Sequence, residues 1–159
     1  AELKVTKGAF YHHIENKDEL ITACFKRTLD IVRELQLIAA ERNTSGWSQL
    51  CDCAQLFVRY HLSPSGPLIR FTSWVSLPEP MRSDMQAEIR RVTQRFTSFF
   101  VDGMVDGSLR ILDQSVASHL LSGCLNASAE LQNWVADVGP DEGVEIYIKP
   151  LFMGILSKP

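Results

Sequence analysis

Residues 17–42 read KDELITACFKRTLDIVRELQLIAAER, and this stretch decides the fold class. Its apolar residues recur at spacings of three, four and seven, which is the pattern of an amphipathic α-helix. The residues on this stripe are Leu20, Ile21, Cys24, Phe25, Ile31, Val32, Leu35 and Ile38. Asn16 is a suitable N-cap, and Asp18 and Glu19 suit the positive end of the helix dipole. We therefore predict one long helix that starts at Lys17 and ends before the turn residues 43–46.

Helical spacing continues through the rest of the chain. Further helices are predicted over 47–62, 85–103, 113–136 and 141–156, and residues 68–77 carry aromatic residues at the same spacing. Segment 113–136 has apolar residues on two adjacent faces, which predicts burial on two sides. Pro150 is expected to kink the last helix near Ile146 or to mark its start. Because no strand pattern competes, the predicted fold class is all-α.

The composition of the chain is that of an ordinary globular protein. It has 159 residues, of which 45% are hydrophobic and 22% charged, so it can bury a core without disulfides or a metal. No apolar run approaches the roughly 18 to 20 residues that span a bilayer, and no signal peptide opens the chain. We therefore expect a cytoplasmic protein that has no membrane partner.

The cysteines and the catalytic motifs give no sign of a metal site or an enzyme. The four cysteines are scattered through helical segments, and Cys51 and Cys53 would point to different sides of one helix. We expect free thiols and no cofactor. The sequence lacks GxSxG, HExxH and phosphate-binding glycine loops, and His119 has no acid one helical turn away. The chain is therefore predicted not to be an enzyme.

The segment before the long helix carries residues suited to nucleic-acid contact. Residues 5–20 read VTKGAFYHHIENKDEL, in which Thr6 is a good N-cap for a short helix. Small residues allow close approach to a groove, and basic and polar ones donate to phosphates or base edges. The predicted DNA-binding residues are Thr6, Lys7, Gly8, Ala9, Tyr11, His12 and Lys17.

This segment resembles the end of the DNA-binding domain of the TetR family of bacterial transcriptional regulators. In that family a Val-Ser/Thr-Lys-Gly turn opens the recognition helix, a Tyr-x-His-Phe segment closes it, and Lys-x-Glu-Leu starts the connecting helix. Here Ile14 replaces the usual Phe and keeps the apolar contact. Residues 104–110, MVDGSLR, are also similar to the regulatory domain of the family. The resemblance implies the end of a helix-turn-helix domain, joined by a long helix to an α-helical ligand-binding and dimerisation domain.

The resemblance also implies a division of the chain into three parts. Residues 1–16 would be the remnant of the helix-turn-helix domain, residues 17–42 the connecting helix, and residues 43–159 the regulatory domain. Two further helices precede this point in the family, so we expect this polypeptide alone to bind operator DNA poorly. The net charge of −3 lies wholly in residues 43–159, where nine Lys and Arg stand against twelve Asp and Glu. Residues 1–42 are neutral, with seven of each sign.

In the resembled family, the later helices enclose a cavity whose ligand lowers operator affinity. We therefore expect a repressor that releases operator DNA when an unidentified small molecule binds. The predicted ligand-binding residues are Phe57, Tyr60, His61, Arg70, Phe71, Trp74, Met85, Phe96, Phe99 and Asn126. Each of these residues also has a plainer interpretation, because aromatic residues at helical spacing more often form the core.

The apolar faces of the last two predicted helices exceed what one small domain needs to cover. The resemblance implies a homodimer in which helices 113–136 and 141–156 pair across a two-fold axis. A helical protein-interaction module without DNA binding is the alternative, because apolar helix faces would permit it as well. The residues encoded upstream of Ala1 would distinguish the two: two amphipathic helices support the regulator, and a start codon supports the interaction module.

Overall fold

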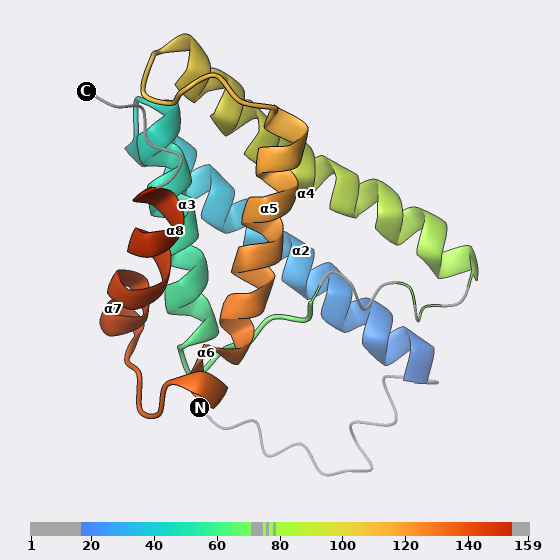
Figure 1. The fold of residues 1–159 in the computed structure, drawn as a ribbon. Helices are drawn as coiled ribbons and strands as arrows, with labels where there is room; N and C mark the ends of the chain where they lie inside the picture. The colour runs from blue at the N-terminus through green and yellow to red at the C-terminus, as the bar shows by residue number, and fades with distance from the viewer. Residues whose placement is uncertain (1–16, 71–74, 76, 78, 154–159) are drawn as a thin grey trace.

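The computed structural model describes residues 17–70, 75, 77 and 79–153, and Figure 1 shows the arrangement of their helices. The DNA-binding residues predicted between Thr6 and His12 lie outside this range. The larger helices are α2 (Lys17–Arg42), α3 (Gly46–His61), α4 (Glu79–Val105) and α5 (Gln114–Ala127). The shorter elements are η2 (Ser128–Glu130), α6 (Leu131–Trp134), α7 (Pro140–Gly143), η3 (Val144–Ile148) and α8 (Lys149–Met153). The described residues contain no strand, and the predicted all-α class is confirmed.

Helix α2 confirms the bounds predicted from its apolar stripe. It buries one side against α3 and α4, with Phe25, Leu29, Val32 and Ala39 at most 1% exposed. The opposite side carries most of its charged residues, as expected of an amphipathic helix. Burial of this stripe, rather than intrinsic propensity, fixes the helix in place.

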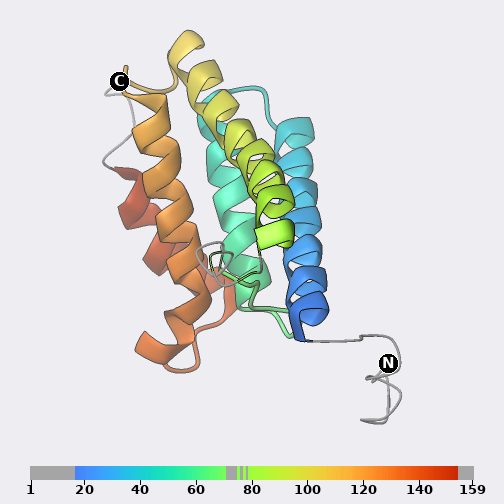
Figure 2. The same cartoon turned by 90° about the vertical axis from the view of Figure 1, so that its right-hand side faces the viewer.

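Helix α3 lies between the long helices and the C-terminal segments. It packs against α2, α4, α7 and η3, while α5 packs against α4. Figure 2 shows α2 at one side of the bundle and α5 with the C-terminal helices at the other. The largest fully buried side chains include Phe96, Phe99 and Phe100 of α4, so aromatic rings from α4 fill the centre of the core.

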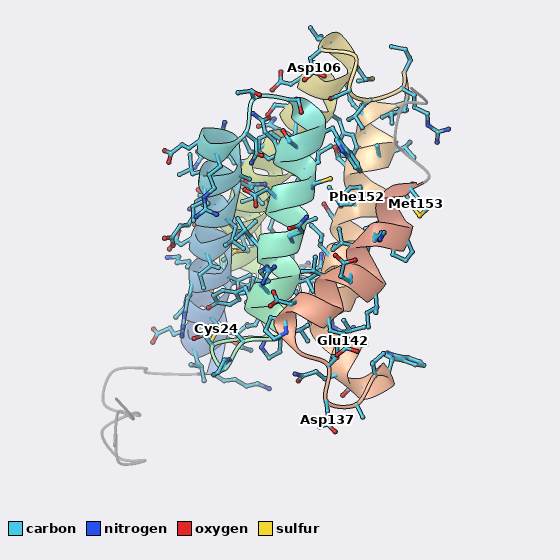
Figure 3. All side chains as sticks on the ribbon, turned by 90° about the vertical axis from the view of Figure 1, so that its left-hand side faces the viewer. Cys24, Asp106, Asp137, Glu142, Phe152 and Met153 are labelled. Carbon is cyan, nitrogen blue, oxygen red and sulfur yellow. The ribbon has the colours of Figure 1, made fainter. Side chains whose placement is uncertain are left out.

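The start of α3 is capped by Ser45 and by the turn that follows α4. Ser45 is the N-cap and accepts a hydrogen bond from the backbone N of Ser48 at 3.2 Å. The backbone N of Gly46 donates to Asp106 Oδ2 at 2.8 Å, and the backbone N of Trp47 donates to Ser108 Oγ at 3.1 Å. Figure 3 labels Asp106 at this end of the molecule. Segment 104–110, which resembles part of the family's regulatory domain, therefore accepts hydrogen bonds from backbone N–H groups that α3 leaves unpaired at its start.

We expect Asp106→Asn to lower Tm by a few degrees, because the asparagine lacks the charge that favours a helix N-terminus. Hydrogen bonds from Ser108 and from the Gly46 backbone lower the pKa of Asp106 below its usual 3.8. The wild-type contribution is therefore present above about pH 4 and is lost as the pH falls through the lowered pKa. Thermal unfolding at pH 7 and pH 3 measures both effects. Asp102→Asn, on the exposed side of α4, is the matched control and should leave Tm unchanged.

The predicted continuous helix over 113–136 is wrong, because α5 ends at Ala127. A 3-10 turn, η2, follows it, and the single helical turn α6 ends at Trp134. The hydroxyl of Ser128 donates to the carbonyl oxygen of Leu125 at 2.7 Å, a local bond that competes with continuation of the helix. The two predicted faces also differ: Leu121 and Leu125 are buried, whereas Leu120 is 62% exposed.

The last helix is distorted near Ile146, where the sequence predicts a kink or a helix start. Residues Val144–Ile148 form a π-helical segment between α7 and α8. Proline has no N–H to donate to the carbonyl one turn earlier, and a widened turn accommodates that loss. Val144, Ile148 and Phe152 of this region are buried, so the distorted helix still presents an apolar side to the core.

Two other features bear on the sequence expectations. Residues 66–70 lack regular secondary structure, so the described start of segment 68–77 is not helical.

The four cysteines are free. Cys53 is buried, and burial, with a smaller contribution from Asp52, raises the pKa of its thiol to about 12. Within the described ranges, no helix has both the length and the apolar composition needed to cross a bilayer.

Candidate functional site

A buried polar pair joins the end of α3 to the end of α5. His61, 6% exposed, lies on the last turn of α3, and its Nδ1 is 2.8 Å from the hydroxyl of Ser128. The single hydroxyl proton of Ser128 goes to the carbonyl of Leu125, so Nδ1–H of His61 donates to Ser128 Oγ. This assignment places the proton on Nδ1 and leaves Nε2 as an acceptor.

The imidazole of His61 is neutral at physiological pH. Burial lowers its pKa from 6.5 to about 4, because the apolar surroundings penalise the charged form. The ring of Phe57 lies edge-on to it, with the ring centroids 5.1 Å apart. No hydrogen bond from a described residue reaches Nε2, and the ring itself lines none of the clefts described below.

A cleft of about 410 Å³ opens next to this pair. It is lined by Ile21, Phe25, Pro67, Leu68, Ile69, Arg70, Ala129 and Glu130. Three parts of the chain form its walls: the first half of α2, the segment after α3, and η2. The backbone N of Ile69 donates to Thr28 Oγ1 at 3.3 Å, which holds the second wall against the first.

The cleft is apolar inside and charged at one edge. Arg70, which is exposed, forms an ion pair with Glu130 that joins two of the walls. Ala129 and Glu130 directly follow Ser128, so the cleft and the buried polar pair share η2. Such a surface suits a mostly apolar molecule with one or two polar groups, because apolar walls give affinity and the few polar groups give orientation.

The structure brings together only some of the predicted ligand-binding residues. Phe57 and His61 are in ring contact, and Arg70 lines the cleft. Phe96 and Phe99 are core residues, and Met85, also buried, lines a different cleft between α2 and α4. Tyr60 is half-buried, and so is Asn126, whose amide donates to the carbonyl of Ser122 at 2.7 Å. Phe71 and Trp74 lie outside the described residues, and Lys17 is the exposed first residue of α2.

Several residues of the cleft and of the buried polar pair were not predicted from the sequence. Ile21 and Phe25 belong to the apolar stripe of α2, where nothing in the pattern separates a cleft residue from a core residue. Ser128 carried a signal, since it stands in a helical pattern but is a residue type that often ends helices by bonding to its own backbone.

A second surface, which we call the α5–α8 groove, lies on the far side of α5. It has a volume of about 440 Å³ and is lined by apolar residues of both helices, among them Val116, Leu120 and Leu151. Val116 and Leu120 are 56% and 62% exposed. Figure 3 labels Phe152 and Met153 of α8; Phe152 is buried and lines the groove, whereas Met153 is 70% exposed. A solvent-exposed apolar strip of this kind is typical of a protein interface.

Most of the chain matches the sequence model of a known protein family. The sequence model of the family described as "Tetracyclin repressor-like, C-terminal domain" matches residues 43–147. The Transposon Tn10 TetC protein of Escherichia coli is 29% identical over 124 residues, which are 75% of this chain and 59% of that protein. The chain therefore spans less than two thirds of the length of this relative.

Solved structures with the same fold include a transcriptional regulator and a protein bound to operator DNA. The ketosteroid transcriptional regulator KstR2 of Mycobacterium tuberculosis has a TM-score of 0.80 and 14% identity, over 95% of this chain and 79% of that one. AibR, solved in complex with isovaleryl coenzyme A and operator DNA, has a TM-score of 0.74 and 18% identity, over 93% of this chain and 80% of that one. At these identities the likeness shows the fold alone.

Proposed function

Because this chain belongs to the tetracyclin-repressor-like (TetR) family and has the fold of its transcriptional regulators, we propose that it is a repressor that releases operator DNA when a small molecule binds its helical domain. Members of the family are typically DNA-binding regulators without enzymatic activity. The proposed partners are operator DNA, an apolar effector and a second copy of the chain.

The proposed division of labour follows the order of the chain. Residues 1–16 would complete the DNA-reading part, α2 would connect it to the sensor, and residues 43–159 would form the sensor. The family match over residues 43–147 supports a sensor that begins at residue 43. Lys17 and the predicted residues Thr6, Lys7, Gly8, Ala9, Tyr11 and His12 remain our candidates for DNA contact.

One observation supports effector control more than any other: the 410 Å³ cleft includes α2 itself. Ile21 and Phe25 lie on the first turns of α2, directly after the segment that resembles a recognition helix. An occupant of the cleft would therefore press on the helix that connects sensor and DNA reader. Release of DNA also requires the occupant to prefer the conformation that fits the operator badly, since only differential affinity shifts an equilibrium.

The proposal predicts a response to apolar compounds that carry one polar group. In a thermal-shift screen, a true effector at about 100 times its Kd should raise Tm by about 5 °C or more, through mass action. In a chain extended by the family's complete helix-turn-helix domain, the same compound should weaken operator binding by about tenfold or more. A compound that binds tightly and leaves operator affinity unchanged would contradict effector control.

Ala129→Phe tests the location of the effector site, because Ala129 lines the cleft and a phenyl ring there would fill it. The variant should stay folded, lose the thermal shift and keep its operator bound in the presence of the compound. Ala136→Phe is the matched control, since Ala136 is exposed and lies outside the cleft residues. Retention of the full response by Ala129→Phe would place the effector elsewhere.

The α5–α8 groove is the proposed dimer surface. A homodimer through residues 113–136 and 141–156 was expected, and the exposed apolar side chains on α5 and α8 within these ranges are Val116, Leu120 and Met153. Trp134 of α6 and Ile146 of η3 are also exposed but do not line the groove. A second copy would cover Val116, Leu120 and Met153, whose exposure in the single chain is otherwise unfavourable. In a two-fold dimer the same patch serves both chains, so one groove lined by apolar residues of α5 and α8 would form both halves of the interface.

We expect Leu120→Glu to convert the dimer into a monomer, because two carboxylates would be buried against an apolar surface across the two-fold axis. The dissociation constant should rise by about a hundredfold or more. Light scattering coupled to size exclusion measures the mass. Val105→Glu is the matched control: Val105 is 82% exposed at the end of α4 and does not line the groove. A wild-type chain that runs as a monomer would contradict the proposal.

A further inference from the structure

Three arginines from two helices converge on a small cavity that the proposed effector site does not use. The cavity has a volume of about 200 Å³ and is lined by Arg33, Gln36 and Leu37 of α2 and by Arg91 and Arg95 of α4. Helices α2 and α4 are packed against each other, so the three guanidinium groups line one face of the bundle. We call these three residues the arginine cluster.

Carboxylates hold two of the three guanidinium groups in place. Glu88 accepts from Arg91 Nη1 through one oxygen, at 2.5 Å, and from Arg33 through the other. Arg33 Nη1 also donates to Asp30 Oδ1 at 2.7 Å. Each guanidinium has five N–H donors, so these bonds leave several donors unused. Arg95 forms no ion pair with any described residue, and the cluster therefore keeps one positive charge in excess over Glu88 and Asp30.

The floor of the cavity is equally fixed. Gln36 is 2% exposed, and its side-chain amide donates to the carbonyl of Val92 at 2.9 Å, which ties α2 to α4 below the cluster. Arg33 and Arg91, which Glu88 and Asp30 hold, therefore extend from a fixed base, whereas Arg95 is exposed and unpaired among the described residues. Donors that are already held lose less side-chain entropy when they bind an anion.

A larger cleft continues from the cluster along the same two helices. It has a volume of about 590 Å³ and shares Arg33 and Arg91 with the cavity. Its apolar residues are Leu29, Met81, Met85 and Ala87, and its polar residues are Thr22, Lys26, Asp30, Asp84 and Glu88. Leu29 and Met85 are at most 2% exposed and form its floor. At its far end the hydroxyl of Thr22 lies 3.1 Å from the sulfur of Met81.

We propose that this α2–α4 cleft binds an organic phosphate ester, with its phosphate on Arg33, Arg91 and Arg95 and its apolar part over Leu29 and Met85. Guanidinium forks match the geometry of phosphate oxygens, and a phosphate offers enough acceptors for three of them. An apolar tail would cover the neighbouring cleft floor. The site is separate from the proposed effector cleft, whose lining residues it does not share.

The position of the cluster argues against the phosphates of operator DNA. Arg33 follows Lys17 by sixteen residues, which places it about 24 Å along the axis of α2 from the helix start. The start of α2 at Lys17 belongs to the segment 5–20 that resembles the end of a DNA-binding domain, so the cluster lies far from it along the helix. A small phosphate-bearing molecule, which needs no connection to the recognition helix, fits this location.

Calorimetric titration of the 159-residue chain with three probes tests the proposal: hexyl phosphate, inorganic phosphate and hexanol. We expect hexyl phosphate to bind at least about tenfold more tightly than either of the others, because only it meets both parts of the cleft. Equal affinity for hexyl phosphate and inorganic phosphate would assign the arginine cluster to free phosphate and overturn the ester. Equal affinity for hexyl phosphate and hexanol would show that the arginines contribute nothing.

Two variants locate the binding. Arg95→Gln removes one guanidinium that makes no ion pair, so the fold should persist while affinity for hexyl phosphate falls about tenfold. Arg90→Gln is the matched control, since Arg90 is exposed on the same helix and lines neither cavity. Thermal unfolding of both variants verifies the fold. Absence of binding by the wild-type chain at millimolar hexyl phosphate, or equal effects of the two variants, would overturn the proposal.

Discussion

Replacing Gly46 with alanine is expected to lower the free energy of unfolding by about 3 kcal/mol or more. A Cβ at this position would lie 2.1 Å from the backbone N of Gly103 and 2.4 Å from the carbonyl oxygen of Phe99. Both contacts are with backbone atoms of α4, so no side chain can rotate away. Helices α3 and α4 would have to separate, which would also stretch the hydrogen bond from Gly46 to Asp106.

Urea unfolding at pH 7 measures this effect. Gly139→Ala is the matched control, because a Cβ on Gly139 meets nothing within 4 Å and its φ of −79° is open to any residue. The control should change the free energy of unfolding by less than about 1 kcal/mol. If the two variants have equal stability, the close approach of α3 and α4 at Gly46 is not as the structure has it.

Acidification from pH 7 to pH 4 is expected to reduce stability by about 3 kcal/mol through His61 alone. Its pKa of about 4 in the folded chain lies below the ordinary 6.5, so the unfolded chain binds more protons between these values. The contribution is complete above pH 6.5 and is lost as the pH falls toward 4. The cause is burial, which leaves the imidazolium without solvation.

His61→Gln should remove this part of the pH dependence while retaining a side chain that can bond to Ser128. The difference in unfolding free energy between wild type and variant should therefore shrink as the pH falls from 6.5 to 4. His119→Gln is the matched control, since His119 is exposed on α5 and the variant should keep the wild-type slope. Parallel stability profiles for wild type and His61→Gln would mean that His61 titrates near its ordinary pKa.

The long helices were predictable because each has one apolar stripe, but α4 begins at Glu79, six residues before the predicted start at Met85. The bounds of α2 follow from its stripe and its acidic first turn, and α3 begins at the predicted turn. The end of α5 was not predictable in this way. Leu131 and Trp134 continue its spacing, yet Trp134 is 81% exposed. The helix ends before Ser128, whose hydroxyl bonds to the Leu125 carbonyl and also contacts His61, 67 residues earlier in the chain.

The candidate site was less predictable than the fold, for a physical reason. Aromatic residues at helical spacing serve equally for core and for ligand contact, so Phe96 and Phe99 fitted both interpretations until their burial was known. His61 and Arg70 were predicted because polar groups stand out in apolar segments. The cleft walls at Leu68 and Ile69 come from a non-helical segment, where periodicity carries no information.

The π-helical turn Val144–Ile148 keeps the register of the last helix. A step of four residues overshoots one turn of an α-helix, which holds about 3.6 residues, and falls short of one turn in the wider π-helix. The step from Val144 to Ile148 and the step from Ile148 to Phe152 therefore rotate in opposite senses and nearly cancel. The π turn therefore absorbs one extra residue, and the three side chains stay buried on one side of the helix.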